Sequence, residues 1–303
     1  MTIEARFDFL PSLSAGRGIG LAAALALAGC ATAPAVSPQS ATAAAPTVPP
    51  AMQWLYGSGE SAASSLQAYS AFRDHVLAAA RARPAQSVVL APGSTLEAPR
   101  FLACGDKPLA VILDVDETAI QNLGYEYDEA YRARSYDEGI WNRWEQTGAN
   151  AVAPVPGAVD ALSAVREAGV TVIFNSNRLT ANAAQTQAAL EAAGLGPARP
   201  GETLWLKGDI APGSAKDPRR AAVATRFCVI AMAGDQLGDF SDLFNAEDLA
   251  VPRRRQAAAS TPFAEMWGNG WFMLSNPVYG PSLQGDFDDV FPVDRRWSDQ
   301  GGN

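Results

Sequence analysis

From residue 109 onward, aliphatic segments of strand length alternate with segments that have the apolar spacing of helices. Residues 109–115 form an aliphatic run broken only by Asp114, which is typical of a strand buried on both faces of a parallel sheet. The same pattern predicts later strands at 170–175, 203–206 and 227–233, and helices at 158–168, 180–193 and 218–225. Such alternation predicts an α/β fold with a doubly wound parallel sheet, in which ligands bind beyond the carboxyl ends of the strands.

Two further segments are predicted to be helical. In residues 53–82, apolar side chains recur at mixed spacings of three and four, and Pro84 follows. Residues 119–148 are rich in aromatic and charged side chains, and a Pro-Val-Pro-Gly sequence at 154–157 ends this segment. We expect the N-terminal helical segment and this insert to form a small helical cap on the sheet.

The first thirty residues predict export and lipidation. An apolar run at 19–28 is too short to span a bilayer, but it suits the hydrophobic region of a signal peptide. Leu27-Ala28-Gly29-Cys30 resembles the lipobox of bacterial lipoproteins, in which the cysteine becomes the lipidated N-terminus. The competing interpretation is an alanine-rich apolar start with an incidental cysteine. We expect a signal peptide at 1–29 and a lipid anchor on Cys30.

The segment after the lipobox predicts a tether. Residues 30–50 consist almost wholly of Ala, Thr, Ser, Pro, Val and Gln, which bury little surface, so we expect this segment to be disordered. The globular domain is expected at 51–292 and a C-terminal tail at 293–303. Because Ala31 and not Asp follows Cys30, the resemblance to sorted lipoproteins implies a lipid-anchored protein of the bacterial outer membrane that faces the periplasm.

Charge and composition narrow the classes of partner. The formal net charge is −9, so nucleic-acid polymers and anionic lipid surfaces are predicted to be poor partners. A substrate that carries phosphate must therefore be held by local positive charge. His75 is the only histidine and lies in a helical pattern, which favours a surface or packing role over catalysis. The oligomeric state is not predicted.

Polar residues follow the predicted strands. Asp114 and Asp116 end the first strand, and two carboxylates placed so close together are costly unless a cation or a shared proton compensates. Asn175-Ser176-Asn177-Arg178 ends the second strand, Lys216-Asp217-Pro218-Arg219 precedes a helix, and Gly234-Asp235-Gln236-Leu237-Gly238-Asp239 follows the last strand. Acid, hydroxyl, base and acid therefore stand at successive strand ends, where an anion and a divalent metal could be held.

These four segments resemble the four motifs of the haloacid dehalogenase superfamily, in their order and on the expected elements. Together with the lipobox and Asn276-Pro277-Val278-Tyr279-Gly280, they resemble the class C acid phosphatases, the bacterial lipoprotein 5′-nucleotidase group. The resemblance covers about residues 53–292. It implies a haloacid dehalogenase-like sheet and a Mg²⁺-dependent hydrolase acting on small phosphomonoesters, with nucleoside 5′-monophosphates as one candidate class.

The resemblance also implies residue roles. Asp114 would be the nucleophile that forms an aspartyl phosphate, and Asp116 the general acid and base. Asp114, Asp235 and the backbone carbonyl of Asp116 would hold Mg²⁺, with Asp239 nearby. Ser176 and Lys216 would bind the transferring phosphoryl oxygens.

Further substrate contacts are expected from Asn177, Arg178, Trp144 and Tyr279. The resemblance implies that the two aromatic rings stack on a nucleobase.

Several of these residues could have a different role. Lys207 competes with Lys216 for the lysine of the third motif. Arg178 and Arg219 could be ion-pair partners that orient acids, and Thr118 could cap the following helix. Asp239 could form a structural ion pair with Lys216. Trp141 and Trp144, which lie three residues apart, could pack in the core.

Cys104 and Cys228 lack the spacing of a metal site. In the superfamily that the sequence resembles, the strands that follow Cys104 and begin at Cys228 are neighbours, which implies a disulfide at the edge away from the catalytic residues. Two further activities stay open: a phosphotransferase with the same intermediate, and a binding lipoprotein without catalysis. Every expected catalytic position is filled, which argues against the second.

Overall fold

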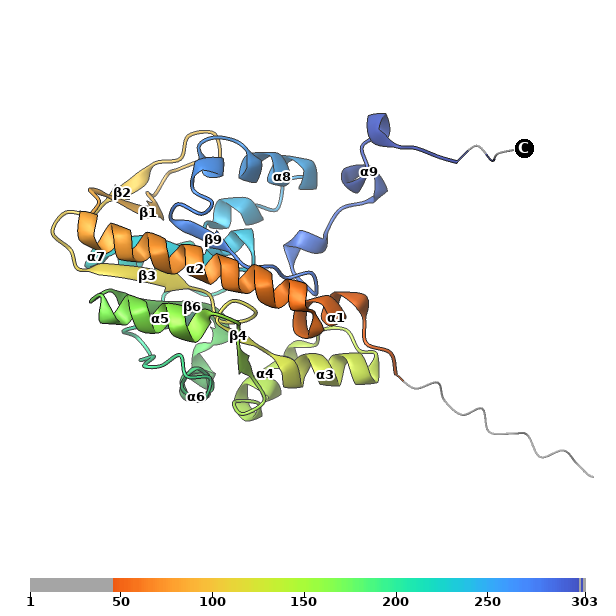
Figure 1. Ribbon diagram of the computed structural model, residues 1–303, viewed down its shortest axis with the longest axis horizontal. Helices are drawn as coiled ribbons and strands as arrows, with labels where there is room; N and C mark the ends of the chain where they lie inside the picture. Colours follow the sequence, from red (N-terminus) through yellow and green to blue (C-terminus); the bar gives the residue numbers. More distant parts are fainter. Residues whose placement is uncertain (1–45, 300, 302–303) are drawn as a thin grey trace, which may run out of the picture. The chain divides into compact units, whose positions relative to one another are not determined.

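The computed structural model describes residues 46–299 and 301. Its central sheet has five parallel strands in the order β7-β6-β3-β8-β9, of which β3, β6 and β9 are labelled in Figure 1. They are β3 (Leu109–Leu113), β6 (Thr171–Leu179), β7 (Leu204–Lys207), β8 (Cys228–Gly234) and β9 (Trp271–Met273). The chain adds β6 and β7 on one side of β3 and then β8 and β9 on the other. This order confirms the doubly wound parallel sheet, and its switch point lies between β3 and β8.

The two central strands are buried throughout, as their aliphatic sequences predict. Every residue of β3 and of β8 is buried. Along β3, Val111 and Leu113 pack into one core, whereas Ala110 and Ile112 pack into the other, because successive side chains of a strand point to opposite faces. The sheet therefore needs a helical layer on each face.

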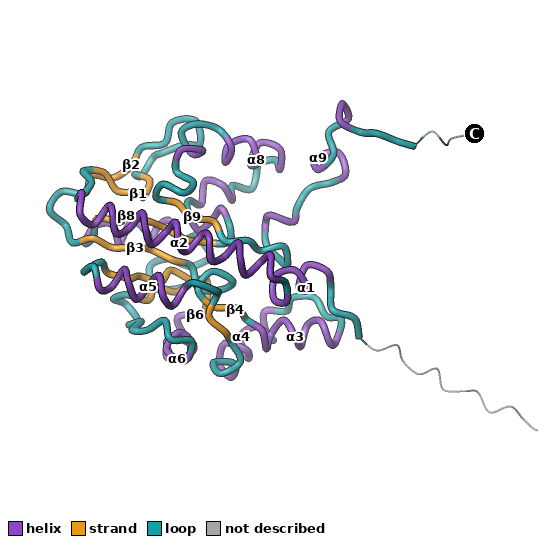
Figure 2. The backbone as a smooth tube through the Cα atoms, in the orientation of Figure 1, coloured by secondary structure: helices purple, strands orange, loops and turns teal. Residues whose placement is uncertain are grey.

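The two faces of the sheet are covered by different elements of the chain (Figure 2). One core joins the sheet to buried side chains of α2 (Gly59–Ala82), α5 (Ala158–Glu167) and α6 (Ala183–Ala192). The other core joins it to α7 (Asp217–Arg226), α8 (Val251–Ala259) and the antiparallel pair β1 (Gln86–Leu90) and β2 (Phe101–Ala103). The predicted helices at 158–168, 180–193 and 218–225 are thus confirmed, the second beginning with a 3₁₀ turn at Thr180–Asn182.

The N-terminal helical segment is divided into two helices. α1 (Pro50–Gly57) ends at Gly57. The hydroxyl of the next residue, Ser58, caps α2 by accepting a hydrogen bond from the Ser61 amide at 3.0 Å. α2 ends at Ala82 and Arg83 is its C-cap residue, with Pro84 next in sequence as predicted. The break changes the direction of the chain and lets Tyr56 of α1 reach the residues that follow β3.

The insert after β3 is also more divided than a single helix. It begins with β4 (Ile120–Gln121), which pairs with β5 (Ala153–Pro154), and continues through α3 (Leu123–Arg132) and α4 (Glu138–Thr147). The side-chain amide of Gln121 donates to the Leu55 carbonyl of α1 at 3.4 Å. With α1, the insert forms a small helical cap (Figure 1). The prediction that the whole N-terminal helical segment belongs to the cap was wrong for α2, whose buried side chains pack against the sheet.

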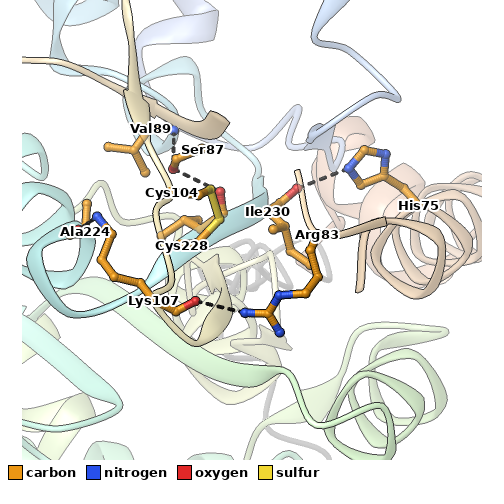
Figure 3. The surroundings of a disulfide bond; sticks show 10 residues. His75, Arg83, Ser87, Val89, Cys104, Lys107, Ala224, Cys228 and Ile230 are labelled. Atoms are coloured by element: carbon orange, nitrogen blue, oxygen red, sulfur yellow. Dashed lines mark hydrogen bonds between the residues drawn. A yellow bond between two sulfur atoms is a disulfide. The ribbon is translucent and has the colours of Figure 1, made fainter. Parts of the chain in front are cut away.

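Cys104 and Cys228 form a disulfide, which confirms the expected pair. Cys228 is the first residue of β8 and lies opposite Leu109, so the bond joins the sheet at the amino ends of β3 and β8 (Figure 3). Nearby, the His75 ring lies 3.1 Å from the Ile230 carbonyl, which is the packing role expected for the only histidine.

Some predicted segments are not tested by these residues. The signal peptide, Cys30 and the tether up to residue 45 lie outside the described part of the chain. Pro50, the last residue of the predicted tether, is already the first residue of α1. Within residues 46–299 and 301, no helix combines the length and the hydropathy needed to cross a bilayer.

Candidate active site

Asp114 and Asp235 directly follow the two central strands. β3 and β8 run in parallel with Leu113 opposite Ala233, and the Asp114 amide donates to the Ala233 carbonyl at 3.0 Å. Both carboxylates therefore leave the sheet at its carboxyl edge, beside each other. This is the place where the topology predicts a ligand site.

A third carboxylate completes this group. Asp239 ends a 3₁₀ turn at Leu237–Asp239, and its side chain accepts a hydrogen bond from the Gln236 amide at 2.9 Å. Asp114, Asp235 and Asp239 are all buried, and one oxygen from each lies within 4.8 Å of the others. We call these three residues the carboxylate triad.

Lys216 is the cation of the triad. It stands at the N-cap position of α7, and its ammonium donates to Asp114 and, at 2.7 Å, to Asp239. The structure thus shows the ion pair with Lys216 that was the alternative role considered for Asp239. Lys207, the rival lysine, is partly exposed, and its ammonium lies 3.9 Å from the Glu138 carboxylate and forms no ion pair with the triad.

The triad carries more negative charge than Lys216 neutralises. Burial raises the pKa of Asp114 well above its usual range, although Lys216 counteracts it. Burial, and then Asp239, raise the pKa of Asp235 to about 7. Burial alone would lower the pKa of Lys216, but Asp114 and Asp239 raise it above its usual value, so the ammonium is charged. A further cation would relieve the remaining repulsion.

The donor set fits such a cation. The triad offers only carboxylate oxygens, which are hard ligands of the kind that Mg²⁺ and similar ions prefer. Three carboxylates against one ammonium leave a net negative site, which a divalent ion would compensate. The triad is therefore compatible with a divalent metal.

Asp116 is held by a different set of donors. Its Oδ1 accepts from Arg178 Nε at 2.9 Å and from Asn122 Nδ2 at 3.0 Å, and Ser176 Oγ lies 3.4 Å from its Oδ2. Arg178 is almost fully buried, so this ion pair is shielded from solvent. Of the two roles considered for Arg178, the structure shows the partner that orients an acid.

Glu117, which sequence reasoning did not select, lies at the centre of a buried network. Tyr56 and Tyr279 donate their hydroxyls to its two carboxylate oxygens, both at 2.9 Å, and the Asn122 amide donates at 2.9 Å. Burial, and then Asp116, raise the pKa of Glu117 to about 7. The network connects α1, the insert and the segment after β9. In the sequence, the only indication of this network was that Glu117 lies inside the first motif.

Asp235 is oriented by three side chains. Thr118 Oγ1 donates to its Oδ1 at 3.1 Å, and the side-chain amides of Asn276 and Gln236 donate to its Oδ2 at 2.8 and 3.1 Å. Thr118 therefore contacts a triad member and does not cap α3, whose N-cap position belongs to Asn122.

Arg219 of α7 forms hydrogen bonds to two residues of the second motif. Arg219 donates to the Ser176 carbonyl at 2.8 Å and to Asn177 Oδ1 at 2.6 Å. Ser176 is fully buried, with its hydroxyl between Asp116 and the Arg178 amide, which donates to it at 3.0 Å. Arg219 thus positions this part of β6 through a carbonyl and an amide, and not through an acid.

A cavity of about 900 Å³ opens over these residues. Its lining includes the triad, Asp116, Lys216 and Asn177, whereas Ser176, Arg178 and Thr118 lie behind the surface. The structure thus brings the predicted polar residues together, some at the cavity wall and others directly behind it.

The aromatic residues divide between the cavity wall and the interior of the insert. Tyr279 and Trp141 line the cavity, but Trp144 does not. The Trp144 ring fills the space that the missing side chains of Gly124 and Gly148 leave, and its indole nitrogen has no hydrogen-bond partner among the described residues. The structure therefore shows a packing role for Trp144 within the insert and outside the two cores of the sheet. Packing was the role that competed with base stacking for either tryptophan.

Comparisons with known proteins found similar solved structures and a matching family. A class C acid phosphatase from Bacillus anthracis is 27% identical, with 77% of this chain and 84% of that chain covered and a TM-score of 0.61. A structure described as class C acid phosphatase from Bacillus anthracis with tungstate bound is 24% identical, with 79% and 92% covered and a TM-score of 0.60. A search of curated proteins gave no match.

The family comparison covers most of the sequence. The family described as HAD superfamily, subfamily IIIB (acid phosphatase) matches residues 35–282, which include all four motifs and the segment with Tyr279. The HAD superfamily is the haloacid dehalogenase superfamily that the motifs resemble. The match extends from before α1 to beyond β9, so the sheet, the cap and the cavity all fall within it. The chain therefore belongs to the acid phosphatases of HAD subfamily IIIB, and it is a phosphomonoesterase.

Proposed function

We propose that the protein is a Mg²⁺-dependent acid phosphatase that hydrolyses small phosphomonoesters through an aspartyl phosphate on Asp114. One observation carries this proposal. Asp114 lines the cavity with Asp235, Asp239 and Lys216 around its carboxylate, while Asp116 lines the same cavity two residues later. A nucleophile, a charge-stabilising group and a proton donor thus face one space.

In the first step, a carboxylate oxygen of Asp114 attacks phosphorus, and the bond from phosphorus to the ester oxygen breaks. Asp116 donates a proton to the departing alkoxide, so the alcohol leaves neutral. The hydrogen bonds from Arg178 and Asn122 support this role because they fix the direction of the Asp116 carboxyl group.

In the second step, water attacks the phosphorus of the aspartyl phosphate. Asp116, now deprotonated, takes a proton from that water, and the bond between phosphorus and Asp114 breaks to release inorganic phosphate. Both residues return to their starting states, so the cycle balances with one water consumed for each ester.

Charge on the phosphoryl oxygens must be stabilised in both steps. Lys216 is proposed for this role because its ammonium contacts the Asp114 carboxylate. Ser176, Asn177 and Arg178 are proposed as contacts or supports at the second motif. Asp114, Asp235 and Asp239 would hold Mg²⁺, with the Asp116 carbonyl as a further ligand. When bound, the ion would offset the negative charge of the carboxylates and of the phosphoryl group.

Aromatic side chains support a leaving group with a flat ring, such as a nucleoside. Trp141 and Tyr279 both line the cavity and are proposed to contact it. Trp141 replaces Trp144 in this proposal because Trp144 is packed against the two glycines.

The test is phosphate release by the full chain in detergent from an aryl phosphate and from nucleoside monophosphates, with and without Mg²⁺. Asp114→Asn should abolish release, while Asp106→Asn, an exposed acid outside the cavity, should retain it. An added alcohol that captures the phosphoryl group would identify a phosphotransferase. Release that persists in Asp114→Asn would overturn the proposed nucleophile.

We also propose that the chain is a lipoprotein of the outer membrane, anchored at Cys30 and facing the periplasm. The support is the sequence Leu27-Ala28-Gly29-Cys30 and the segment rich in Ala, Pro and Thr between it and α1. Cys30→Ser should prevent incorporation of radiolabelled palmitate and leave the protein unprocessed. Equal labelling of the variant and the natural chain would contradict the anchor.

A further inference from the structure

The wall of the cavity that α3 and α4 provide is rich in acidic and aromatic side chains. From residues 123–147 the lining includes four carboxylate side chains and three aromatic rings, and no lysine or arginine. The carboxylates belong to Glu126, Glu129, Glu138 and Glu145. The two lysines among the lining residues, Lys207 and Lys216, come from other elements. This wall is therefore an unfavourable surface for an anionic leaving group.

One of the four carboxylates has a buried oxygen without a donor. Glu126 is 3% exposed, and its Oε2 is buried without a hydrogen-bond donor among the described residues. The backbone amide of Glu126 is satisfied, because it donates to the Asn122 carbonyl at the start of the helix. A buried carboxyl oxygen that accepts no hydrogen bond is costly, so its presence at a cavity wall calls for an explanation.

The remaining three carboxylates are accounted for. Glu129 accepts from the Tyr125 hydroxyl at 2.6 Å. Glu145 accepts from the Leu179 amide at 3.0 Å and from Asn182 Nδ2 at 2.7 Å. Glu138 is largely exposed and lies 3.9 Å from Lys207. The missing donor is therefore specific to Glu126.

The surroundings of Glu126 are negative. Its acidic neighbours are Glu117, Glu129 and Asp116, and burial together with these three groups raises its pKa to about 8. No lysine or arginine of the described chain forms an ion pair with it. A positive group that entered the cavity would favour the ionised form of Glu126 and would then be attracted by its carboxylate.

The three aromatic rings favour the same kind of group. Trp141 packs edge-on against Tyr125 with ring centroids 4.8 Å apart, and Tyr136 lies 6.5 Å from Trp141. Aromatic faces attract ammonium groups, and the attraction increases where water is excluded. A wall that combines carboxylates with rings is thus suited to an organic amine.

We propose that Glu126 is a specificity-determining residue that accepts a hydrogen bond from a protonated amine on the leaving alcohol of the substrate. The preferred substrates would be phosphomonoesters of amino alcohols or of aromatic alcohols bearing an amine. Esters of the same shape that carry a carboxylate would be disfavoured. This inference rests on the proposed phosphatase function, because it concerns the alcohol part of the substrate in the same cavity.

The test uses three phenyl phosphates that differ in one para substituent: aminomethyl, hydroxymethyl or carboxymethyl. Hydrolysis by the full chain gives kcat and KM for each. The variant is Glu126→Gln, which keeps the size of the side chain and removes the acidic group that could pair as a carboxylate with a protonated amine. The control is Asp128→Asn, which removes a charge from the same helix at a residue outside the cavity lining.

We expect the natural chain to prefer the aminomethyl ester to the carboxymethyl ester by about tenfold or more in kcat/KM, a difference of about 1.4 kcal/mol. Glu126→Gln should raise KM for the aminomethyl ester about tenfold and leave kcat and the hydroxymethyl ester within about twofold, because a contact remote from phosphorus contributes mainly to binding. Asp128→Asn should leave the ratio unchanged.

Two results would overturn the inference. One is a natural chain that hydrolyses the carboxymethyl ester as well as the aminomethyl ester, which decides the question even if the variant does not fold. The second is a folded Glu126→Gln protein with the ratio of the natural chain. Either result leaves the phosphatase function intact, whereas failure of that function would abolish hydrolysis of all three esters.

Discussion

At the scale of single residues, Lys216 is the positively charged residue that contacts the proposed nucleophile, Asp114. Its buried ammonium contacts Asp114 and Asp239, while the Asp242 carboxylate accepts from its backbone amide at 2.9 Å. The backbone contact fixes where the lysine leaves the start of α7, and the two side-chain contacts fix the direction of the ammonium. The sequence left Lys207 as a rival, and a pair of variants separates the two.

Lys216→Met should lower kcat by about 10²–10³-fold, because a donor aimed at developing phosphoryl charge is removed. It should also reduce the free energy of unfolding by about 3–5 kcal/mol, because buried carboxylates lose their ammonium. Lys207→Met should change each quantity little. Steady-state kinetics and urea denaturation measure both, and a larger loss of kcat in Lys207→Met would reverse the assignment.

Glu126 gives a prediction on stability that does not depend on activity. A carboxyl group with a raised pKa binds its proton in the folded chain up to about pH 8, whereas the unfolded chain releases it near pH 4.5. Folded protein thus holds more protons between these values, so this group makes stability fall as pH rises. Glu117, Glu129 and Asp116 face it and maintain the shift.

Glu126→Gln removes this contribution. The variant should melt at a higher temperature than the natural chain at pH 8, and the difference should shrink towards pH 5. A gain of about 1 kcal/mol corresponds to roughly 2–4 °C for a domain of this size. Thermal melts at several pH values, with Asp128→Asn as control, measure this effect. A difference in melting temperature between Glu126→Gln and the natural chain that is the same at every pH would contradict the burial of an unpaired carboxyl group.

At the scale of elements, the disulfide and the site lie at opposite ends of the same two strands. Cys228 begins β8, and Asp235 directly follows its last residue; β3 likewise runs from Leu109, opposite Cys228, to the residue before Asp114. The bond therefore constrains the sheet without contacting the chemistry.

Reduction of Cys104–Cys228 should lower the free energy of unfolding by about 3–5 kcal/mol, because it releases a closed loop of more than a hundred residues in the unfolded chain. Activity at 25 °C should persist. Denaturation with and without reductant measures the effect. The double variant Cys104→Ala, Cys228→Ala, which lacks the disulfide, is the control for the reduced protein. Loss of activity without loss of stability would contradict this separation.

The sequence predicted the strands and helices that have a regular apolar pattern, and it missed the elements that have none. The runs that became β3 and β8 and the helices between them were predictable because their burial imposes a strong pattern. β9 has three residues and β2 has three, which is too short for a period to be read, and β1 pairs with β2 across residues 91–100. The single helix expected at 119–148 became two because Ala133, at the end of α3, takes a left-handed conformation before α4 starts.

The site was predictable where motifs carry it and not where distant residues meet. Asp114, Lys216 and Asp235 could be named because each follows a strand or precedes a helix. The role of Glu117 depends on Tyr56 and Tyr279, which are 61 and 162 residues away from it. No local pattern encodes those contacts. For the same reason, the sequence alone could not show which of two tryptophans three residues apart faces the cavity.

At the scale of the whole molecule, the net charge and the topology of the sheet have different effects on a substrate that carries phosphate. The chain carries a formal net charge of −9, so nothing in its overall field attracts a phosphate. The doubly wound sheet instead gathers Asp114, Asp235 and Lys216 from three separate parts of the sequence at one edge. The proposed function therefore depends on whether a phosphoryl group reaches Asp114 there.

The most direct measurement is mass spectrometry of Asp116→Asn, quenched in acid during turnover of an aryl phosphate with a very acidic leaving group. Such a group departs without a proton donor, but hydrolysis of the intermediate still needs the base that this variant lacks. We expect one phosphoryl group on the peptide that contains Asp114, and none when Asp114→Asn is added. A phosphoryl group on another residue, or continued turnover with no phosphorylated enzyme, would contradict the proposed mechanism.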